Sequence, residues 1–165
     1  MSLSSPAPGT CYSSAATLYG AGNGDVLTAA GTGLQGLHAG SGNETLTGAA
    51  ATGADTFFGG AGKDLIIGGL GTNTYVGGAG QVTVNAAGAS NLFQFVDGSA
   101  GGTTLVNDLT NASQVHISLA GYGPNEAANA VANQGPSINS VAVTLSDNTT
   151  ITFENITHLS GANFS

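Results

Sequence analysis

The chain has 165 residues, of which 41% are hydrophobic and 6% are charged, and its formal net charge is −8 because Lys63 is the only basic residue beside nine carboxylates. Phosphate binding needs clustered Lys and Arg, so this composition argues against nucleic acid as a partner. The hydrophobic content favours a packed structure over disorder. No apolar stretch approaches the roughly 18 residues of a membrane span, so none is expected.

Residues 1–19 are expected to form an N-terminal arm ahead of a repeat region. The first twenty residues lack a basic region and a long apolar run, so they do not match a cleaved secretory signal. The chain must therefore use another signal if it leaves the cytosol. Cys11 is the only cysteine, so no intrachain disulfide holds the fold. An idle or buried thiol is expected, with an intermolecular bridge as the alternative.

Residues 20–94 show glycine pairs at a nine-residue period, which indicates a solenoid. Three consecutive units keep perfect register: 59–67 (GGAGKDLII), 68–76 (GGLGTNTYV) and 77–85 (GGAGQVTVN). Degenerate units flank them, at 20–28, 30–38, 39–47, 53–58 and 86–94. Glycines at the first, second and fourth places are expected to allow a turn with positive φ.

The eighth place of the units carries an apolar residue that is expected to point inward from a short strand. This column consists of Leu37, Leu46, Phe57, Ile66, Tyr75, Val84 and Phe93. Stacking of the units would bury the column as one core, because no unit alone can bury its strand. Two units make one coil, so turns two units apart are predicted to stack on the same edge, at the strand spacing of about 4.8 Å.

Unit 59–67 matches in full the pattern G-G-x-G-x-D-x-U-x, in which U is apolar, and the repeat resembles the hemolysin-type, or RTX, nonapeptide. The resemblance implies a parallel β-roll whose turn carbonyls and sixth-place aspartates bind Ca²⁺ through oxygen. It therefore implies that Gly59, Gly60, Gly62 and Asp64 belong to one calcium-binding turn.

The sixth place holds a carboxylate in only some units, so Ca²⁺ is not expected in every turn. In chain order the sixth-place residues are Asp25, Gln35, Glu44, Asp55, Asp64, Asn73, Val82 and Asn91. The predicted stacks are Glu44, Asp64 and Val82 on one edge and Asp55, Asn73 and Asn91 on the other. The Glu44–Asp64 and Asp55–Asn73 steps are the two predicted calcium sites, because affinity follows ligand charge. A largely calcium-independent roll is the alternative, since Asn tolerates turns and stacks without charge repulsion.

Residues 95–165 lose the nine-residue period and are expected to form a β-rich capping and secretion-type module. Strands are predicted at 103–106 and 115–119, a short helix over 124–134, and a hairpin from 141–145 and 151–153. A solenoid needs such a cap, because an open end exposes unpaired backbone and core. The stretches SLAGYGPNEAANAVANQ and LSDNTTITFENITHL resemble the C-terminal modules of bacterial proteins exported by type I secretion, which implies export by a non-Sec route.

The expected fold is therefore all-β, a parallel β-roll (β-solenoid) with a C-terminal β-rich cap that contains a hairpin and one short helix. No catalytic or metal-binding motif involves the three dispersed histidines, and an enzyme is not expected. The leading hypothesis is a secreted extracellular structural protein that binds Ca²⁺ and self-associates into a polymer or cell-surface layer, as a surface-layer, matrix or adhesive filament subunit. The alternatives are a calcium-responsive folding and secretion module without assembly, and the tail of an enzyme or carbohydrate-binding protein.

Overall fold

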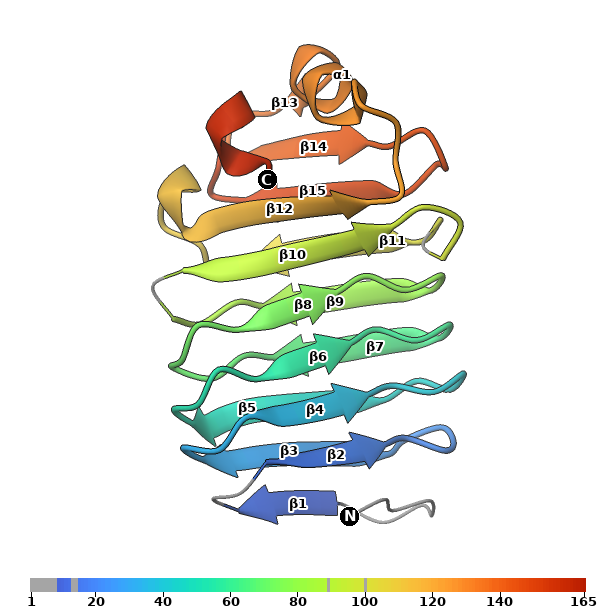
Figure 1. The fold of residues 1–165 in the computed structure, drawn as a ribbon, viewed down its shortest axis with the longest axis vertical. Helices are drawn as coiled ribbons and strands as arrows, with labels where there is room; N and C mark the ends of the chain where they lie inside the picture. Colours follow the sequence, from blue (N-terminus) through green and yellow to red (C-terminus); the bar gives the residue numbers. More distant parts are fainter. Residues whose placement is uncertain (1–8, 13–14, 89, 100) are drawn as a thin grey trace.

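A computed structural model describes residues 9–12, 15–88, 90–99 and 101–165, which form two facing β-sheets closed at one end by a cap (Figure 1). The nine-stranded sheet consists, in spatial order, of β1 (Gly9–Tyr12), β3 (Val26–Gly31), β5 (Thr45–Ala51), β7 (Lys63–Ile67), β9 (Gln81–Asn85), β11 (Thr103–Asn107), β15 (Thr150–Glu154), β14 (Ser140–Thr144) and β13 (Gly135–Pro136). The six-stranded sheet consists of β12 (Val115–Ala120), β10 (Asn91–Val96), β8 (Thr74–Val76), β6 (Thr56–Phe58), β4 (Gln35–His38) and β2 (Ala16–Tyr19). The helical elements are η1 (Ala112–Gln114), α1 (Glu126–Ala132) and η2 (Gly161–Asn163).

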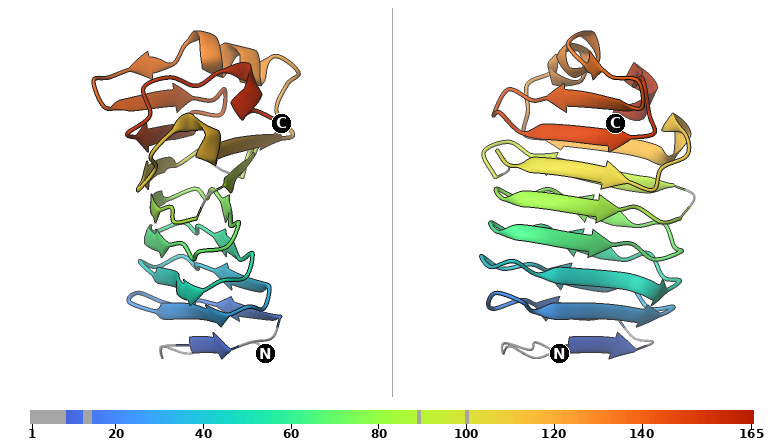
Figure 2. Two further views of the ribbon diagram at one scale, coloured as in Figure 1. Left: turned by 90° about the vertical axis from the view of Figure 1, so that its left-hand side faces the viewer. Right: turned by 180° about the vertical axis from the view of Figure 1, so that it is seen from behind.

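Consecutive strands of the roll alternate between the two sheets, and each pairs in parallel with the strand two positions further along the chain. The register aligns eighth-place residues directly, for example Phe57 with Tyr75 and Ile66 with Val84. Two layers of strands therefore run along the whole roll (Figure 2). The predicted all-β parallel β-roll is confirmed.

The inward-facing residues of the two sheets form one continuous core. All seven predicted eighth-place residues are buried, each at most 2% exposed. The rings of Phe57, Tyr75 and Phe93 stack along the six-stranded sheet with centroid separations of 5.6 and 5.2 Å. Phe153 of the opposite sheet meets Phe93 edge-on at 5.4 Å. The predicted apolar column is thus the core, and it joins the roll to the cap.

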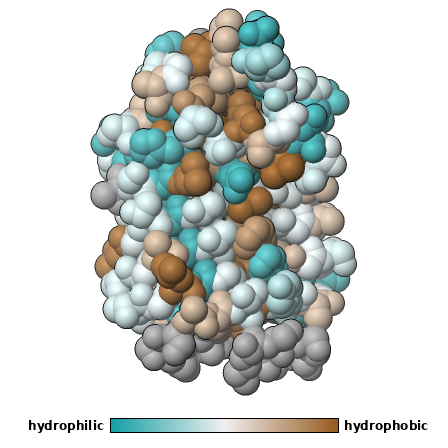
Figure 3. Space-filling view, in the orientation of Figure 1, coloured by the Kyte–Doolittle hydropathy of each residue, from teal (hydrophilic) through white to brown (hydrophobic). Residues whose placement is uncertain are grey.

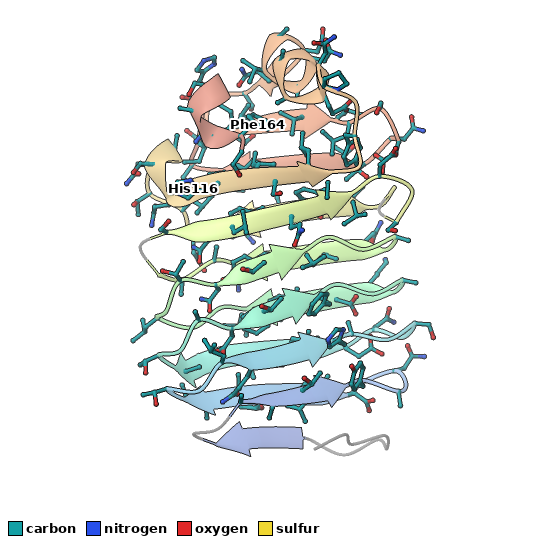
Figure 4. The ribbon with its side chains drawn as sticks, in the orientation of Figure 1. His116 and Phe164 are labelled. Atoms are coloured by element: carbon teal, nitrogen blue, oxygen red, sulfur yellow. The ribbon has the colours of Figure 1, made fainter. Side chains whose placement is uncertain are left out.

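The outward face of the six-stranded sheet carries residues of mixed polarity, with hydrophobic residues interspersed among hydrophilic ones (Figure 3). His38 lies in an outward row, stacked between Tyr19 at 4.6 Å and Phe58 at 3.9 Å. His116 lies on β12 beside the C-terminal segment (Figure 4). Both histidines are strand residues.

The roll extends beyond residues 20–94 in both directions. Strands β1 and β2, which fall in the predicted N-terminal arm 1–19, pair in parallel with β3 and β4 as a first coil. Strands β11 and β12, which fall in the predicted module 95–165, continue the two sheets beside β9 and β10. The nonapeptide marks only the coils with tight turns, whereas backbone pairing itself needs no sequence motif. The expectation of an idle or buried thiol concerns the Cys11 side chain, which the structure does not describe.

The C-terminal cap contains the predicted helix and hairpin. Strands β14 and β15 form the antiparallel hairpin, and β15 also pairs in parallel with β11, so the cap continues the nine-stranded sheet. At the end of the six-stranded sheet, Phe164 forms a parallel bridge with Ile117, and the Ser165 N–H donates to the Ile117 carbonyl at 2.9 Å (Figure 4). Among the described residues, β13 is the terminal strand of the nine-stranded sheet at this end, and β12 of the six-stranded sheet is bridged by Phe164.

The turn glycines of the perfect units do not have positive φ, so that expectation was wrong. Positive φ occurs instead at Gly24, Gly31, Gly88, Gly98, Gly101 and Gly121. The glycines of unit 59–67 are required by close stacking of coils: a Cβ on Gly60 would lie 1.9 Å from the Gly40 carbonyl oxygen, and one on Gly62 would lie 1.4 Å from that of Gly42. Any side chain at these places would force the coils apart.

Candidate calcium site

The sixth-place side chains are buried in two stacks, one along each edge of the roll. The carboxylate edge consists of Asp25, Glu44 and Asp64. The amide edge consists of Gln35, Asp55, Asn73 and Asn91. Each of these seven residues is at most 5% exposed. Buried polar side chains of this kind require hydrogen-bond partners or counterions.

On the carboxylate edge, Glu44 and Asp64 are stacked one above the other in neighbouring coils. The Glu44 N–H donates to Asp64 Oδ1 at 3.0 Å, and Asp64 Oδ2 accepts from the Gly60 N–H at 3.0 Å. Glu44 Oε1 accepts from the Gly42 N–H at 3.1 Å. Glu44 Oε2, however, is buried without a hydrogen-bond partner among the described residues. This free oxygen lies on one of two neighbouring carboxylates.

The electrostatics of this step favour a bound cation or a proton. Burial, together with the neighbouring Asp64 carboxylate, raises the pKa of Glu44 to about 7. Lys63, the only basic side chain of the chain, is exposed. A divalent cation would neutralise both carboxylates at once and supply a partner for Glu44 Oε2.

The oxygen donors at this step fit Ca²⁺, which takes six to eight oxygen ligands from carboxylates and carbonyls. Within the described ranges, no group of three or more His, Cys, Asp or Glu side chains is placed to hold a metal ion. Glu44 and Asp64 would therefore hold Ca²⁺ together with carbonyls of the surrounding turns. Gly59, Gly60 and Gly62 are in the segment that precedes Asp64, and their place in a calcium-binding turn stays a prediction.

Asp25 also belongs to the carboxylate edge, although it was missing from the predicted stack. The Thr45 N–H donates to the Asp25 carbonyl at 2.9 Å, which places Asp25 in line with Glu44. Asp25 Oδ2 accepts from the N–H groups of Ala21 and Gly22 at 2.8 and 3.1 Å. The sequence contained the signal, a sixth-place Asp, but the extra residue after its unit hid the alignment.

The amide edge has the predicted stacking order. The Asp55 N–H donates to Asn73 Oδ1 at 3.2 Å, and the Asn73 N–H donates to Asn91 Oδ1 at 3.4 Å. The Gln35 N–H donates to Asp55 Oδ1 at 3.0 Å. Asp55 Oδ2 is buried without a partner among the described residues, and burial raises the pKa of Asp55. Each side chain thus bonds to the backbone of the preceding coil.

A family model agrees with these repeats. The family model of the RTX calcium-binding nonapeptide repeat (4 copies) matches residues 50–84. Among curated proteins, none matches the chain. Among solved structures, the crystal structure of extracellular lipase LipA from Serratia marcescens has a TM-score of 0.42 and 12% identity over 90% of this chain, which spans 39% of the length of that lipase. Residues 50–84 therefore carry RTX calcium-binding nonapeptide repeats, and they form coils of the β-roll.

Proposed function

We propose that the chain is an extracellular structural protein whose β-roll is stabilised by Ca²⁺ on the carboxylate edge. The observation that carries this proposal is the unpartnered Glu44 Oε2 beside the buried Asp64 carboxylate. Without a cation, folding must bury two neighbouring carboxylates, which opposes the folded state. With Ca²⁺, the same burial becomes a binding site, so the folded state is favoured where the cation is abundant.

Export by a type I-like, non-Sec route fits this dependence. A chain with a calcium-free carboxylate edge is least stable where free Ca²⁺ is scarce, as it is inside cells, and gains stability outside. The C-terminal module of residues 95–165 is the part that resembles exported proteins. Among the described residues, no helix combines the length and apolar content needed to cross a bilayer. A structural rather than a catalytic role is part of the proposal.

We expect Ca²⁺ to raise the unfolding midpoint of the wild-type chain and Asp64→Asn to remove most of that rise. A cation present at about 100 times its Kd stabilises by roughly 2.7 kcal/mol, which corresponds to about 5–10 °C for a chain of this length. The measurement is thermal unfolding by circular dichroism in chelator and in about 10 mM Ca²⁺, which is roughly 10–100 times the Kd of extracellular calcium modules.

Asp108→Asn is the matched control, because it makes the same chemical change at an exposed residue outside both edges. Asp108 has φ of 64°, a conformation that Asn also tolerates. This control should keep the full calcium-induced rise. Calcium stabilisation that is absent from the wild type, or undiminished in Asp64→Asn, would contradict the proposal.

A second candidate function is self-association, for which the ends of the sheets are the relevant observation. In the part of the chain that the structure describes, β1 and β2 are terminal strands with one neighbour each, whereas at the other end the terminal strands are β13 of the cap and β12, which is bridged at Ile117 by Phe164. Unpaired strand edges are templates for pairing with another chain, and the low charge of this chain offers little repulsion. The uncapped end favours contact between two N-terminal ends, which forms a closed dimer as the unit of a surface layer or matrix.

This candidate predicts a concentration-dependent mass in sedimentation velocity, measured in Ca²⁺. The test variant is Thr17→Pro in the terminal strand β2, because proline removes a backbone N–H and is tolerated only where that N–H is not needed for pairing. Its mass should stay monomeric at concentrations at which the wild type dimerises, with circular dichroism confirming the fold. A wild-type chain that remains monomeric at millimolar concentration would rule out self-association.

A further inference from the structure

The amide edge differs from the carboxylate edge in what its side chains bond to. Asn73 Nδ2 donates to the carbonyl oxygens of Gly69 and Gly71, at 2.9 and 3.2 Å. Asn91 Nδ2 donates to the Ala87 carbonyl oxygen at 3.0 Å. These amides therefore turn their hydrogen atoms toward the carbonyls of their own turns.

The carboxylate edge shows the opposite polarity. There the sixth-place oxygens accept hydrogen bonds from turn N–H groups, as Asp64 does from Gly60 and Glu44 does from Gly42. A carboxylate cannot donate, so it leaves the carbonyls of its own turn available to a cation. An amide NH₂ carries two donors and occupies those carbonyls itself.

The step between Asp55 and Asn73 shows the consequence of this difference. The side-chain NH₂ of Asn73 donates to the carbonyl oxygens of Gly69 and Gly71, and Asn73 Oδ1 accepts from the Asp55 N–H. The Asn73 side chain, which is fully buried, has no donor left for Asp55. Asp55 Oδ2 accordingly remains without a hydrogen-bond partner among the described residues.

We propose that the side-chain amides of Asn73 and Asn91 take the place of a bound cation, so that calcium binds on the carboxylate edge alone. The proposal rests on the proposed function for the carboxylate edge, and it replaces the expected calcium site at Asp55–Asn73. Asn73 is the residue that determines this specificity, because its amide occupies two turn carbonyls beside the only carboxylate of the amide edge. The amide edge then stays ordered without calcium.

The decisive variant is Asn73→Asp, which frees the carbonyls of Gly69 and Gly71 and places a second carboxylate beside Asp55. We expect it to bind one Ca²⁺ ion more than the wild type in isothermal titration calorimetry and equilibrium dialysis. The same variant should have a lower unfolding midpoint than the wild type in chelator and recover in Ca²⁺. Asn73→Ala, the matched control without a carboxylate, should gain no ion.

Two further variants locate the gained ion and keep the test decisive. Adding Asp55→Asn to Asn73→Asp should remove the extra ion, and Asp55→Asn alone should leave the wild-type ion number unchanged. The proposal is overturned if folded Asn73→Asp gains no ion, or if Asp55→Asn alone loses one. If Asn73→Asp does not fold, the ion number of Asp55→Asn alone still tests the proposal: an unchanged number supports it, and a loss of one ion overturns it.

Hydrogen exchange provides a readout that does not depend on counting ions. On chelation of the wild type, turn amides around Gly60 and Gly62 should lose protection, whereas those around Gly69 and Gly71 should keep it. Equal loss on both edges would overturn the proposal. Failure of the proposed function is distinguishable, because it shows as a wild type that binds no ion removable by Asp64→Asn.

Discussion

Replacement of Gly62 by Ala is expected to lower the unfolding midpoint by roughly 5–10 °C, both with and without calcium. The added Cβ would lie 1.4 Å from the Gly42 carbonyl oxygen and 3.1 Å from Asn43 Oδ1. The Gly42 carbonyl is backbone in the neighbouring coil, so it cannot move away as the end of a side chain would. The coils must separate locally, which weakens the hydrogen bonds between the turns. Thermal unfolding by circular dichroism measures the change.

Gly22→Ala is the matched control in a turn of the same edge. A Cβ there would have no described atom within 4 Å, and Gly22 does not have positive φ. Its midpoint should stay close to that of the wild type. Equal destabilisation by the two variants would show that glycine is required for its backbone freedom, and not for the close approach of stacked coils.

The stability of the calcium-free chain is expected to decrease as the pH rises from about 4.5 to about 7. Burial and Asp64 raise the pKa of Glu44 from its ordinary 4.5 to about 7, so the folded state holds a proton that the unfolded state releases earlier. The contribution of this group is therefore fully present below pH 4.5 and is lost as Glu44 ionises. Asp55, whose pKa is also raised by burial, acts in the same direction.

Calcium should reverse this trend, because it binds the ionised carboxylates. The difference between the midpoints in Ca²⁺ and in metal-free buffer should be small at pH 5 and largest near pH 8, and binding near pH 6.5 should release protons in calorimetry. Glu44→Gln is the control, because it removes the contribution of Glu44 alone. Burial lowers the pKa of His38, which gives a pH dependence of opposite sign, but this contribution is present in both proteins and cancels in their difference. A metal-free difference between wild type and Glu44→Gln that does not change with pH would contradict the assignment.

Much of the roll could be predicted because the period of the sequence and the geometry of the fold coincide. The nine-residue repeat placed Phe57, Tyr75 and Phe93 in one buried column, and the same count placed Asp64 after Glu44 on one edge. Alternation of inward and outward side chains along each strand makes such positions readable without coordinates.

Other features depended on atoms contributed by neighbouring coils. The insertions before Asp55 and after Asp25 conceal which turns stack, so Asp25 was not aligned with Glu44. The first coil, β1 and β2, has no glycine motif and is held by backbone pairing to β3 and β4. The need for glycine at Gly62 follows from the position of the Gly42 carbonyl, which no local pattern reports.

The sequence by itself determined the solenoid class, its core column and the types of side chain on each edge, because these follow from period and chemical identity. Only the tertiary structure decided how those side chains bond. An Asn at the sixth place is compatible with a ligand oxygen or with a donor to the turn, and the position of the Gly69 and Gly71 carbonyls selects the donor for Asn73. The unpartnered oxygens of Glu44 and Asp55 likewise arise only when stacked coils exclude water from both.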